Sequence, residues 1–432
     1  MYCAQLLGFL AVLMFLVNGQ AYSQNINYAK DVLAHLCSEE LHGRGYVSKG
    51  DSLAAAFIAN EFGKYGLKHW GTSYMQPFDI SVNTLPGKVK LAVNGKTLVP
   101  GVDFIVEAGT PTIKGTFEAV YLTSSDLLDG DTWVHIVKNA GGKFIILQED
   151  DLSTLSDDER KKVQQIVRAL KYYNRIPLAG IIIPNKEKLT WGCSAAEFPR
   201  PIIMTTQKFE RGELYRFEID IENEFIDQYR TQNVIGYIEG SQYPDSLLVF
   251  TAHYDHLGRM GSDTYFPGAN DNASGTAMLL DMARHYSLPE NKPPYSIVFM
   301  AFGAEEIGLQ GSKFFTEYPL FPLEQIRFLI NVDLAGTGDE GITVVNATIF
   351  EEQFSLLQQI NQQSQLLPQV NKRGQACNSD HCSFHEKGVP CFFIYTLGGT
   401  TAYHDVFDKA ETLPLTEYED YFKLLTRFVH KL

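Results

Sequence analysis

The periodic spacing of apolar residues predicts two short helices near the start of the chain. Residues 28–41 place their apolar side chains on one face, which is the pattern of an amphipathic helix. A second helix is predicted over residues 52–65, and Gly66 follows it at a position where glycine commonly ends a helix. A glycine-rich break at residues 42–45 separates the two helices.

Residues 76–226 have a different pattern, in which short apolar runs typical of strands dominate. The run VKLAV precedes Asn94-Gly95, a dipeptide that favours a tight hairpin turn. One helix is predicted from a capping box that starts at Ser156, and it extends to Tyr173. No cluster of acidic and histidine residues falls in this region. We therefore expect an inserted β-rich domain over residues 76–226.

From about Thr231 onward, predicted strands alternate with helices. Continuous apolar runs, which are typical of buried strands, occur at residues 247–252, 297–302, 328–332 and 389–395. A helix is predicted over residues 273–286, between the first two of these strands. Continuous apolar strands joined by helical crossovers indicate a largely parallel sheet with helices on both faces. We predict an α/β fold with a mostly parallel mixed sheet, formed by residues 24–75 and 227–432.

The N-terminal residues have the pattern of a targeting segment. The apolar run LLGFLAVLMFLV at residues 6–17 is too short to span a bilayer but fits the core of a signal peptide. Small residues at Ala21 and Ser23 offer cleavage positions. The absence of Lys or Arg before the run favours the alternative, a buried N-terminal helix. We expect residues 1–23 to be a signal peptide, no membrane anchor elsewhere, and an exported protein that is periplasmic or secreted.

Composition and charge limit the classes of protein to which this chain could belong. The 432 residues are 45% hydrophobic and 20% charged, which is the balance of a globular protein large enough for two domains. A net charge of −15 argues against a nucleic-acid partner, because phosphate binding requires basic patches.

Removal of the leader would leave an odd number of cysteines, so that at least one thiol stays unpaired. These cysteines are Cys37, Cys193, Cys377, Cys382 and Cys391. Cys377 and Cys382 are close enough in sequence to form a disulfide, although spacing alone does not show that they do.

Acidic and histidine residues follow the predicted buried strands. Open α/β sheets bind their ligands beyond the carboxyl ends of the strands, and three strands here end directly before such side chains. A further acid opens the predicted helix at residues 273–286, and a further histidine follows a glycine-rich loop near the C-terminus. The residues in chain order are His253, Asp255, Asp271, Glu305, Glu306, Asp333 and His404.

Taken singly, each of these residues has an ordinary structural explanation; Asp271, for example, could be a helix cap. Together, five acids and two histidines at one edge of one sheet would place many like charges in a buried site, which is strongly unfavourable without cations. Zinc binds histidine nitrogen and carboxylate oxygen, and a metal pair needs a carboxylate that bridges both ions. The pattern therefore indicates a hydrolytic metal pair with one spare carboxylate as a general base.

The order and spacing of five segments resemble the co-catalytic zinc aminopeptidases. The segments are HYD, GANDNASG, GAEEIGLQGS, NVDLAG and YHDVFD, and the resemblance runs from about Val234 to the C-terminus. That family also includes glutamate carboxypeptidase, glutaminyl cyclase and the non-enzymatic transferrin receptor ectodomain. The segment LHGRG at residues 41–45 is similar to the start of the family's catalytic domains. Residues 76–226 resemble, more loosely, a protease-associated domain.

The resemblance implies two Zn²⁺ ions per chain and a set of protein ligands. His253 and Asp333 would bind one zinc ion, and Glu306 and His404 would bind the other. Asp271 would bridge the two ions.

The resemblance also implies three catalytic roles. Glu305 would be the general base that activates a water held between the metals. Asp255 would orient His253, and Tyr403 would hydrogen-bond the tetrahedral intermediate. His256, by contrast, has no role that the pattern requires.

The implied function is the hydrolysis of the N-terminal peptide bond of peptides, with the metal-bridging water as nucleophile. One alternative is a glutaminyl-cyclase-like acyltransferase with a single zinc ion. A carboxypeptidase or dipeptidase of the same family is another. A binding protein that has lost catalysis is disfavoured, because every expected ligand position carries an acceptable residue. The insert is expected to restrict access to the site without contributing to the chemistry.

Overall fold

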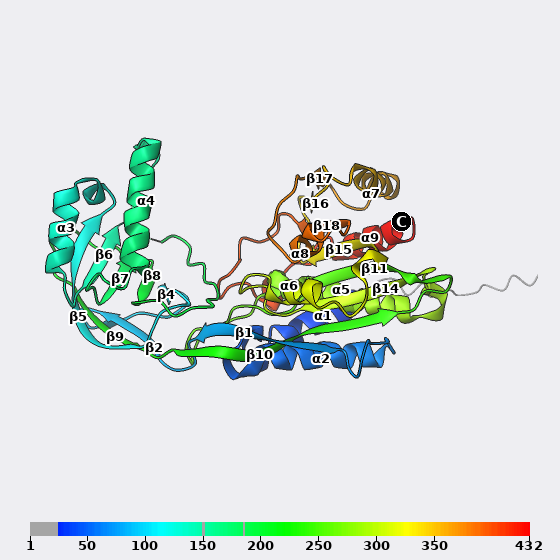
Figure 1. Ribbon diagram of the computed structural model, residues 1–432, viewed down its shortest axis with the longest axis horizontal. Coiled ribbons are helices and arrows are strands. Elements are labelled where there is room, and N and C mark those ends of the chain that lie inside the picture. The colour runs from blue at the N-terminus through cyan, green and yellow to red at the C-terminus, as the bar shows by residue number, and fades with distance from the viewer. Residues whose placement is uncertain (1–24, 149–151, 185) are drawn as a thin grey trace, which may run out of the picture.

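The computed structural model describes residues 25–148, 152–184 and 186–432. The predicted leader at residues 1–23 lies outside this range. Two eight-stranded sheets make up the molecule, and they lie at opposite ends of its long axis in Figure 1. Within the part of the chain that is described, no helix has the length and apolar character needed to cross a membrane.

The first sheet contains the strands that end at the predicted site. Its strands in spatial order are β1 (Met75–Thr84), β10 (Glu224–Ile238), β14 (Tyr295–Phe302), β11 (Tyr243–His253), β15 (Ile326–Asp333), β18 (Cys391–Thr396), β16 (Ile342–Val345) and β17 (Val370–Lys372). The central strands β14, β11, β15 and β18 are parallel, whereas β1, β10 and β16 form antiparallel pairs. The predicted mixed α/β fold is therefore confirmed.

Helices cover both faces of this sheet because successive strand residues point to opposite sides. In β11, Leu248 and Phe250 pack into one core while Leu247 and Val249 pack into another. The first core is closed by α1 (Ile26–Leu36), α2 (Gly50–Lys64), α5 (Ser274–Ser287), α7 (Glu351–Ser364) and α9 (Tyr418–Val429). The second core is closed by α6 (Gln310–Glu317) and α8 (His381–Glu386).

The first predicted helix ends earlier than expected. Helix α1 ends at Leu36, and the chain continues in a tight turn over Glu39–Arg44. Gly43 has a φ of 65°, and a Cβ atom there would lie 2.5 Å from the carbonyl oxygen of Phe266. Only glycine fits so close an approach between two backbones. The helix itself ends earlier because Ser38 has an extended backbone, with φ −65° and ψ 151°.

The second sheet lies in the β-rich part of the chain. Its strands in spatial order are β3 (Lys96–Thr97), β2 (Val89–Val93), β9 (Arg216–Ile221), β5 (Ile113–Thr123), β6 (Phe144–Gln148), β7 (Gly180–Ile183), β8 (Ile202–Thr205) and β4 (Phe104–Val106). Helices α3 (Gly130–Asn139) and α4 (Asp157–Tyr172) pack on one face. The predicted capping box of α4 and the predicted turn between β2 and β3 are both present.

The two sheets are connected at one point and share apolar packing. Strand β1, which sequence analysis placed at the start of the insert, pairs with β10 in the first sheet. Thr84 and Glu224 are register partners, so the chain leaves the first sheet and returns to it at adjacent positions. The core beneath the second sheet also includes Leu257 and Phe266, which come from the connection after β11. A two-stranded ribbon, β12 (Gly258–Arg259) and β13 (Tyr265–Phe266), lies in that connection.

Candidate metal centre

The carboxyl ends of three neighbouring strands bring the predicted residues together. His253 is the last residue of β11, and Asp333 is the last residue of β15. Glu305 and Glu306 follow β14, whose final residue Phe302 is the register partner of His253. Asp271 lies in a single turn, Ala269–Ala273, directly before α5. The side chains of His253, Asp271 and Asp333 are all buried.

His253 faces two carboxylates through one ring nitrogen. Its Nε2 lies 3.3 Å from Oδ1 of Asp271 and 3.5 Å from Oδ2 of Asp333. Its Nδ1 lies 3.1 Å from the main-chain oxygen of Asp255. A carbonyl oxygen only accepts hydrogen bonds, so Nδ1 carries a proton and Nε2 is the atom left to bind a metal. Donor atoms of His253, Asp271 and Asp333 lie within 4.8 Å of one another.

His404 is oriented in the same way on the other side of Asp271. Its Nε2 lies 2.9 Å from Oδ2 of Asp271 and 3.3 Å from Oε2 of Glu306. Its Nδ1 lies 3.0 Å from the main-chain oxygen of Trp191. Asp271 therefore presents one carboxylate oxygen to each histidine, which is the geometry of a bridging ligand.

A third histidine, His256, also faces this cluster, although sequence analysis gave it no role. Its side chain is fully buried, and its Nδ1 lies 2.7 Å from Oε1 of Glu306. Donor atoms of His256, Asp271 and Glu306 lie within 4.8 Å of one another. Glu306 is thus flanked by His256 and His404. The only signal in the sequence was the position of His256, three residues after His253.

The carboxylate of Asp255 has a different set of contacts from the one that sequence analysis assigned to it. It lies 3.9 Å from Nδ1 of His253, whereas it accepts hydrogen bonds from the main-chain N–H groups of Glu305 (3.1 Å) and Glu306 (3.3 Å). The hydroxyl of Tyr46 donates a further bond at 3.3 Å. Burial raises the pKa of Asp255 to about 7. The carboxylate thus fixes the turn that carries both glutamates, and the main chain of Asp255 orients His253.

Glu305 and Tyr403 line the pocket above the acids. The carboxylate of Glu305 forms no hydrogen bond or ion pair with the described residues, and burial raises its pKa well above the usual range. The ring of Tyr403 stacks on His404, with 4.1 Å between ring centroids, and 45% of the residue is exposed. Leu334, Phe393 and Tyr395 give the same pocket an apolar and aromatic wall.

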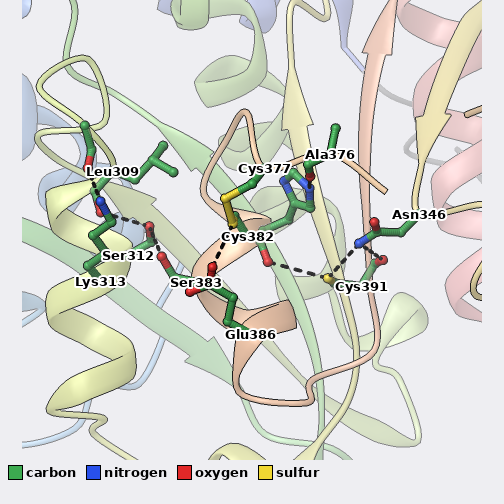
Figure 2. The surroundings of a disulfide bond; sticks show 12 residues. Leu309, Ser312, Lys313, Asn346, Ala376, Cys377, Cys382, Ser383, Glu386 and Cys391 are labelled. Atoms are coloured by element: carbon green, nitrogen blue, oxygen red, sulfur yellow. Dashed lines mark hydrogen bonds between the residues drawn. A yellow bond between two sulfur atoms is a disulfide. The ribbon is translucent and has the colours of Figure 1, made fainter. Parts of the chain in front are cut away.

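A disulfide supports one side of this pocket. Cys377 and Cys382 are bonded (Figure 2). Asn378, which lies between them in the sequence, lines the pocket. The ring of His381 stacks on Phe393 with 5.1 Å between centroids. The thiol of Cys391 donates to the main-chain oxygen of His381. The remaining described cysteines, Cys37, Cys193 and Cys391, are unpaired.

Two further buried residues brace the turn that holds Asp271. Arg44 is fully buried, and its guanidinium donates to the main-chain oxygens of Leu36, Tyr254, Pro267, Gly268 and Asp271. The carboxylate of Asp408 accepts from the main-chain N–H groups of Asn270 and Asp271, the latter at 3.1 Å. Both residues lie inside sequence segments that resemble the family, LHGRG and YHDVFD, but neither was assigned a role.

The cluster of acids has the charge and the donor atoms of a metal site. Within residues 25–148, 152–184 and 186–432, the ion-pair partners of Asp271, Glu306 and Asp333 are histidines, with no Lys or Arg among them. Buried carboxylates at such short mutual distances repel one another unless cations lie between them. Imidazole nitrogen and carboxylate oxygen are donors that suit zinc. The residues present therefore fit a pair of divalent metal ions.

Comparison with known proteins agrees with this site. Residues 233–429 match the model of peptidase family M28. Aminopeptidase YwaD of Bacillus subtilis strain 168 is 30% identical over 254 residues, 54% of this chain and 52% of YwaD, so the chain spans about half the length of this relative.

Two solved structures share the fold. BSAP, a zinc aminopeptidase from Bacillus subtilis, has a TM-score of 0.68 at 21% identity. The alignment covers 94% of this chain and 95% of the BSAP chain. A Peptidase M28 precursor from Shewanella amazonensis SB2B has a TM-score of 0.72 at 16% identity. This alignment covers 94% of this chain and 93% of the precursor chain. The matched region 233–429 contains every acid and histidine of the cluster, so the part of the chain that forms the candidate metal centre is similar to peptidase family M28.

Proposed function

We propose that this protein is a zinc-dependent aminopeptidase that hydrolyses the N-terminal peptide bond of peptides. The observation that carries the proposal is the position of Asp271, whose two carboxylate oxygens face the Nε2 atoms of His253 and His404. In the same pocket, Glu305 adds a carboxylate that forms no hydrogen bond or ion pair with the described residues. The similarity to YwaD and to the fold of BSAP supports the choice of reaction.

We assign two zinc ions to each chain: His253 and Asp333 would hold one, His404 and Glu306 would hold the other, and Asp271 would contact both. When bound, such ions supply Lewis acidity and lower the pKa of water. Calorimetric titration with zinc should give two tight equivalents for the unchanged protein. We expect fewer than two for Asp271→Ala, because two cations would face each other without the intervening carboxylate. Two tight equivalents in that variant would contradict the bridging role.

In this proposal the chain's own residues move the proton and stabilise charge. Glu305 accepts a proton from the attacking water and returns it to the leaving amine. The hydrogen bonds from the amides of Glu305 and Glu306 to Asp255 hold the glutamate turn in place. The hydroxyl of Tyr403 is assigned to the oxygen that becomes negatively charged in the tetrahedral intermediate.

The substrate is a peptide with a free N-terminus, whose amino group the acids of the pocket attract. A matched panel tests this: aminoacyl peptides, the same peptides with an acetylated N-terminus, and peptides that begin with glutamine, each with zinc and with a chelator. We expect zinc-dependent release of the first residue and no cleavage of the acetylated set. C-terminal trimming of acetylated peptides would indicate a carboxypeptidase. Cyclisation of N-terminal glutamine with one zinc equivalent would indicate an acyltransferase.

We also propose that the protein is exported to the periplasm or secreted. The apolar run at residues 6–17 and the disulfide between Cys377 and Cys382 support this, because disulfides persist in oxidising compartments. N-terminal sequencing of the protein from its native source should give a start near Tyr22 or Gln24. An intact Met1 in a cytoplasmic fraction would contradict the proposal.

A further inference from the structure

The loop between β7 and β8 of the second sheet reaches the candidate metal centre. Its segment Lys188–Ser194, here called the strap, lies against the loop that carries His404; both loops run between the two sheets (Figure 1). The main-chain N–H of Trp191 donates to the carbonyl oxygen of His404 at 2.9 Å. In return, the carbonyl oxygen of Trp191 lies 3.0 Å from Nδ1 of the His404 ring. The strap thus forms hydrogen bonds with both the backbone and the side chain of His404.

The indole of Trp191 anchors the strap in the core under the second sheet. Only 7% of the residue is exposed, and its Nε1 donates to the main-chain oxygen of Val106 at 2.7 Å. The indole also stacks on Phe266, with 4.6 Å between ring centroids. Because these contacts fix the side chain, they also fix the position of the carbonyl group that His404 uses.

Both ends of the strap are tied to the part of the chain that forms the site. Nζ of Lys188 donates to the main-chain oxygen of Thr401 at 2.6 Å and lies 3.4 Å from the carboxylate of Asp405. At the other end, the main-chain oxygen of Ser194 accepts from the N–H of Asn83 in β1 at 2.8 Å. The strap is therefore held to the His404 loop and to the first sheet at the same time.

The two histidines that face Asp271 consequently depend on different parts of the molecule. The Nδ1 partner of His253 is the carbonyl of Asp255, two residues along the same strand end. The Nδ1 partner of His404 is Trp191, which is 213 residues away and belongs to the loop between two strands of the second sheet. The partner of the second ring nitrogen fixes the tautomer and ring orientation of a metal-binding histidine and affects metal affinity.

We propose that the strap positions His404 for metal binding, with Trp191 as the positioning residue. Metal occupancy beside His404 then depends on the docking of the second sheet, whereas occupancy beside His253 does not. The inference rests on the proposed function in so far as His404 is a metal ligand. It also changes the expectation that the β-rich region contributes nothing to the chemistry.

Zinc titration of full-length variants tests this proposal. For Trp191→Ala we expect one tight site and a second site weakened by about 10–100-fold, the usual effect of losing a partner of a metal-binding histidine. Trp191→Phe keeps an aromatic ring for stacking on Phe266 and should bind both ions nearly as the unchanged protein does. The matched control is Trp133→Ala, because Trp133 is a partly buried indole of the same region that lies in α3 and packs on the core beneath it. This control should keep two tight sites.

Kinetics give a second readout. In Trp191→Ala, kcat should fall with little change in KM and should recover as zinc is added, which a general folding defect would not show. If Trp191→Ala does not fold, Lys188→Ala replaces it, because this side chain is 45% exposed and its loss only unties one end of the strap. It should weaken the same single site.

Two tight zinc sites in folded Trp191→Ala would overturn the proposal. The same result in Lys188→Ala would overturn it when that variant is the replacement. Equal weakening of zinc binding in Trp133→Ala would also overturn it. Failure of the proposed function is distinguished by His404→Ala: two unchanged sites in that variant would show that His404 is no ligand.

Discussion

The two histidines that face Asp271 each donate from Nδ1 to a main-chain carbonyl oxygen, that of Asp255 or that of Trp191. This arrangement has a consequence for the acids of the site. Because no carboxylate is needed to orient His253, the carboxylate of Asp255 is available to hold the amides of Glu305 and Glu306.

Sequence reasoning could place His253, Glu305 and Asp333 together because each follows a buried parallel strand, and such strands end at one edge. It could not find Trp191, since the group that acts is a main-chain carbonyl, which every residue carries. Nor could it place the contacts of the Asp255 carboxylate correctly, because a carboxylate two residues from a histidine could contact either that ring or the neighbouring turn. The distinction depends on tertiary geometry alone.

The first prediction concerns the carboxylate of Glu305, which is the proposed general base. Glu305→Gln removes the proton acceptor but leaves the histidines and carboxylates that face one another unchanged. We expect kcat to fall by about 10²–10⁴-fold, the range of general-base catalysis. Zinc titration of the same variant should still give two equivalents. Retention of most of kcat would show that another group accepts the proton.

Proton release on metal binding is the second prediction. Burial alone would lower the pKa of His404, but its hydrogen bonds to Asp271 and Glu306 outweigh burial and raise the pKa to about 11. In the metal-free protein His404 is therefore protonated at neutral pH, and an incoming ion must displace that proton. Apparent zinc affinity should rise with pH across the neutral range, by up to about tenfold per unit for one displaced proton.

Calorimetry at pH 7 in two buffers of different ionisation enthalpy measures this release. His404→Ala provides the matched control, because the proton contributed by that ring should be missing. Zinc affinity that does not change between pH 6 and pH 8 would contradict this account of the pKa of His404.

At the scale of elements, a strand or helix can be predicted from sequence when the pattern that defines it lies within its own residues. Strands β11, β14 and β15 were found because central parallel strands are continuous apolar runs. The assignment of β1 to the first sheet could not be read from the sequence. Its alternating burial would suit the edge of either sheet, and its partner β10 lies about 150 residues further along the chain.

The turn before α5 depends on another element for its shape, and this gives the third prediction. Arg44→Met removes the hydrogen bonds that the guanidinium donates to five buried carbonyl oxygens, among them that of Asp271. The oxygen of Gly268 keeps a donor, the main-chain N–H of Ala273. We expect a loss of about 3–5 kcal/mol in the free energy of unfolding, measured with urea, because each unpaired buried polar group is costly.

The matched control for Arg44 is Arg230→Met. Arg230 pairs with Asp79 on the surface, and both side chains are more than half exposed. An exposed pair of this kind contributes about 0–1 kcal/mol. Equal losses in the two variants would show that the buried network around Arg44 does not stabilise the turn.

At the scale of the whole molecule, the second sheet is joined to the first in three ways. The chain crosses between them only at Thr84 and Glu224, the apolar core under the second sheet takes in Phe266, and the strap contacts His404. The crossing point is a covalent link, whereas the second is apolar packing and the third consists of hydrogen bonds. This division allows the contribution of the second sheet to be separated from the fold of the first.

The last prediction uses this crossing point. Because Thr84 and Glu224 are register partners in an antiparallel pair, residues 85–223 can be replaced by Asn-Gly, which turns β1 and β10 into a hairpin. The shortened chain keeps every acid and histidine of the centre but loses the strap. If circular dichroism and cooperative unfolding show a folded core, zinc titration should give one tight equivalent and one weakened equivalent. Turnover should be low and should rise with added zinc, as in full-length Trp191→Ala. A folded core that binds two zinc ions as tightly as the intact protein would show that His404 needs no support from the second sheet.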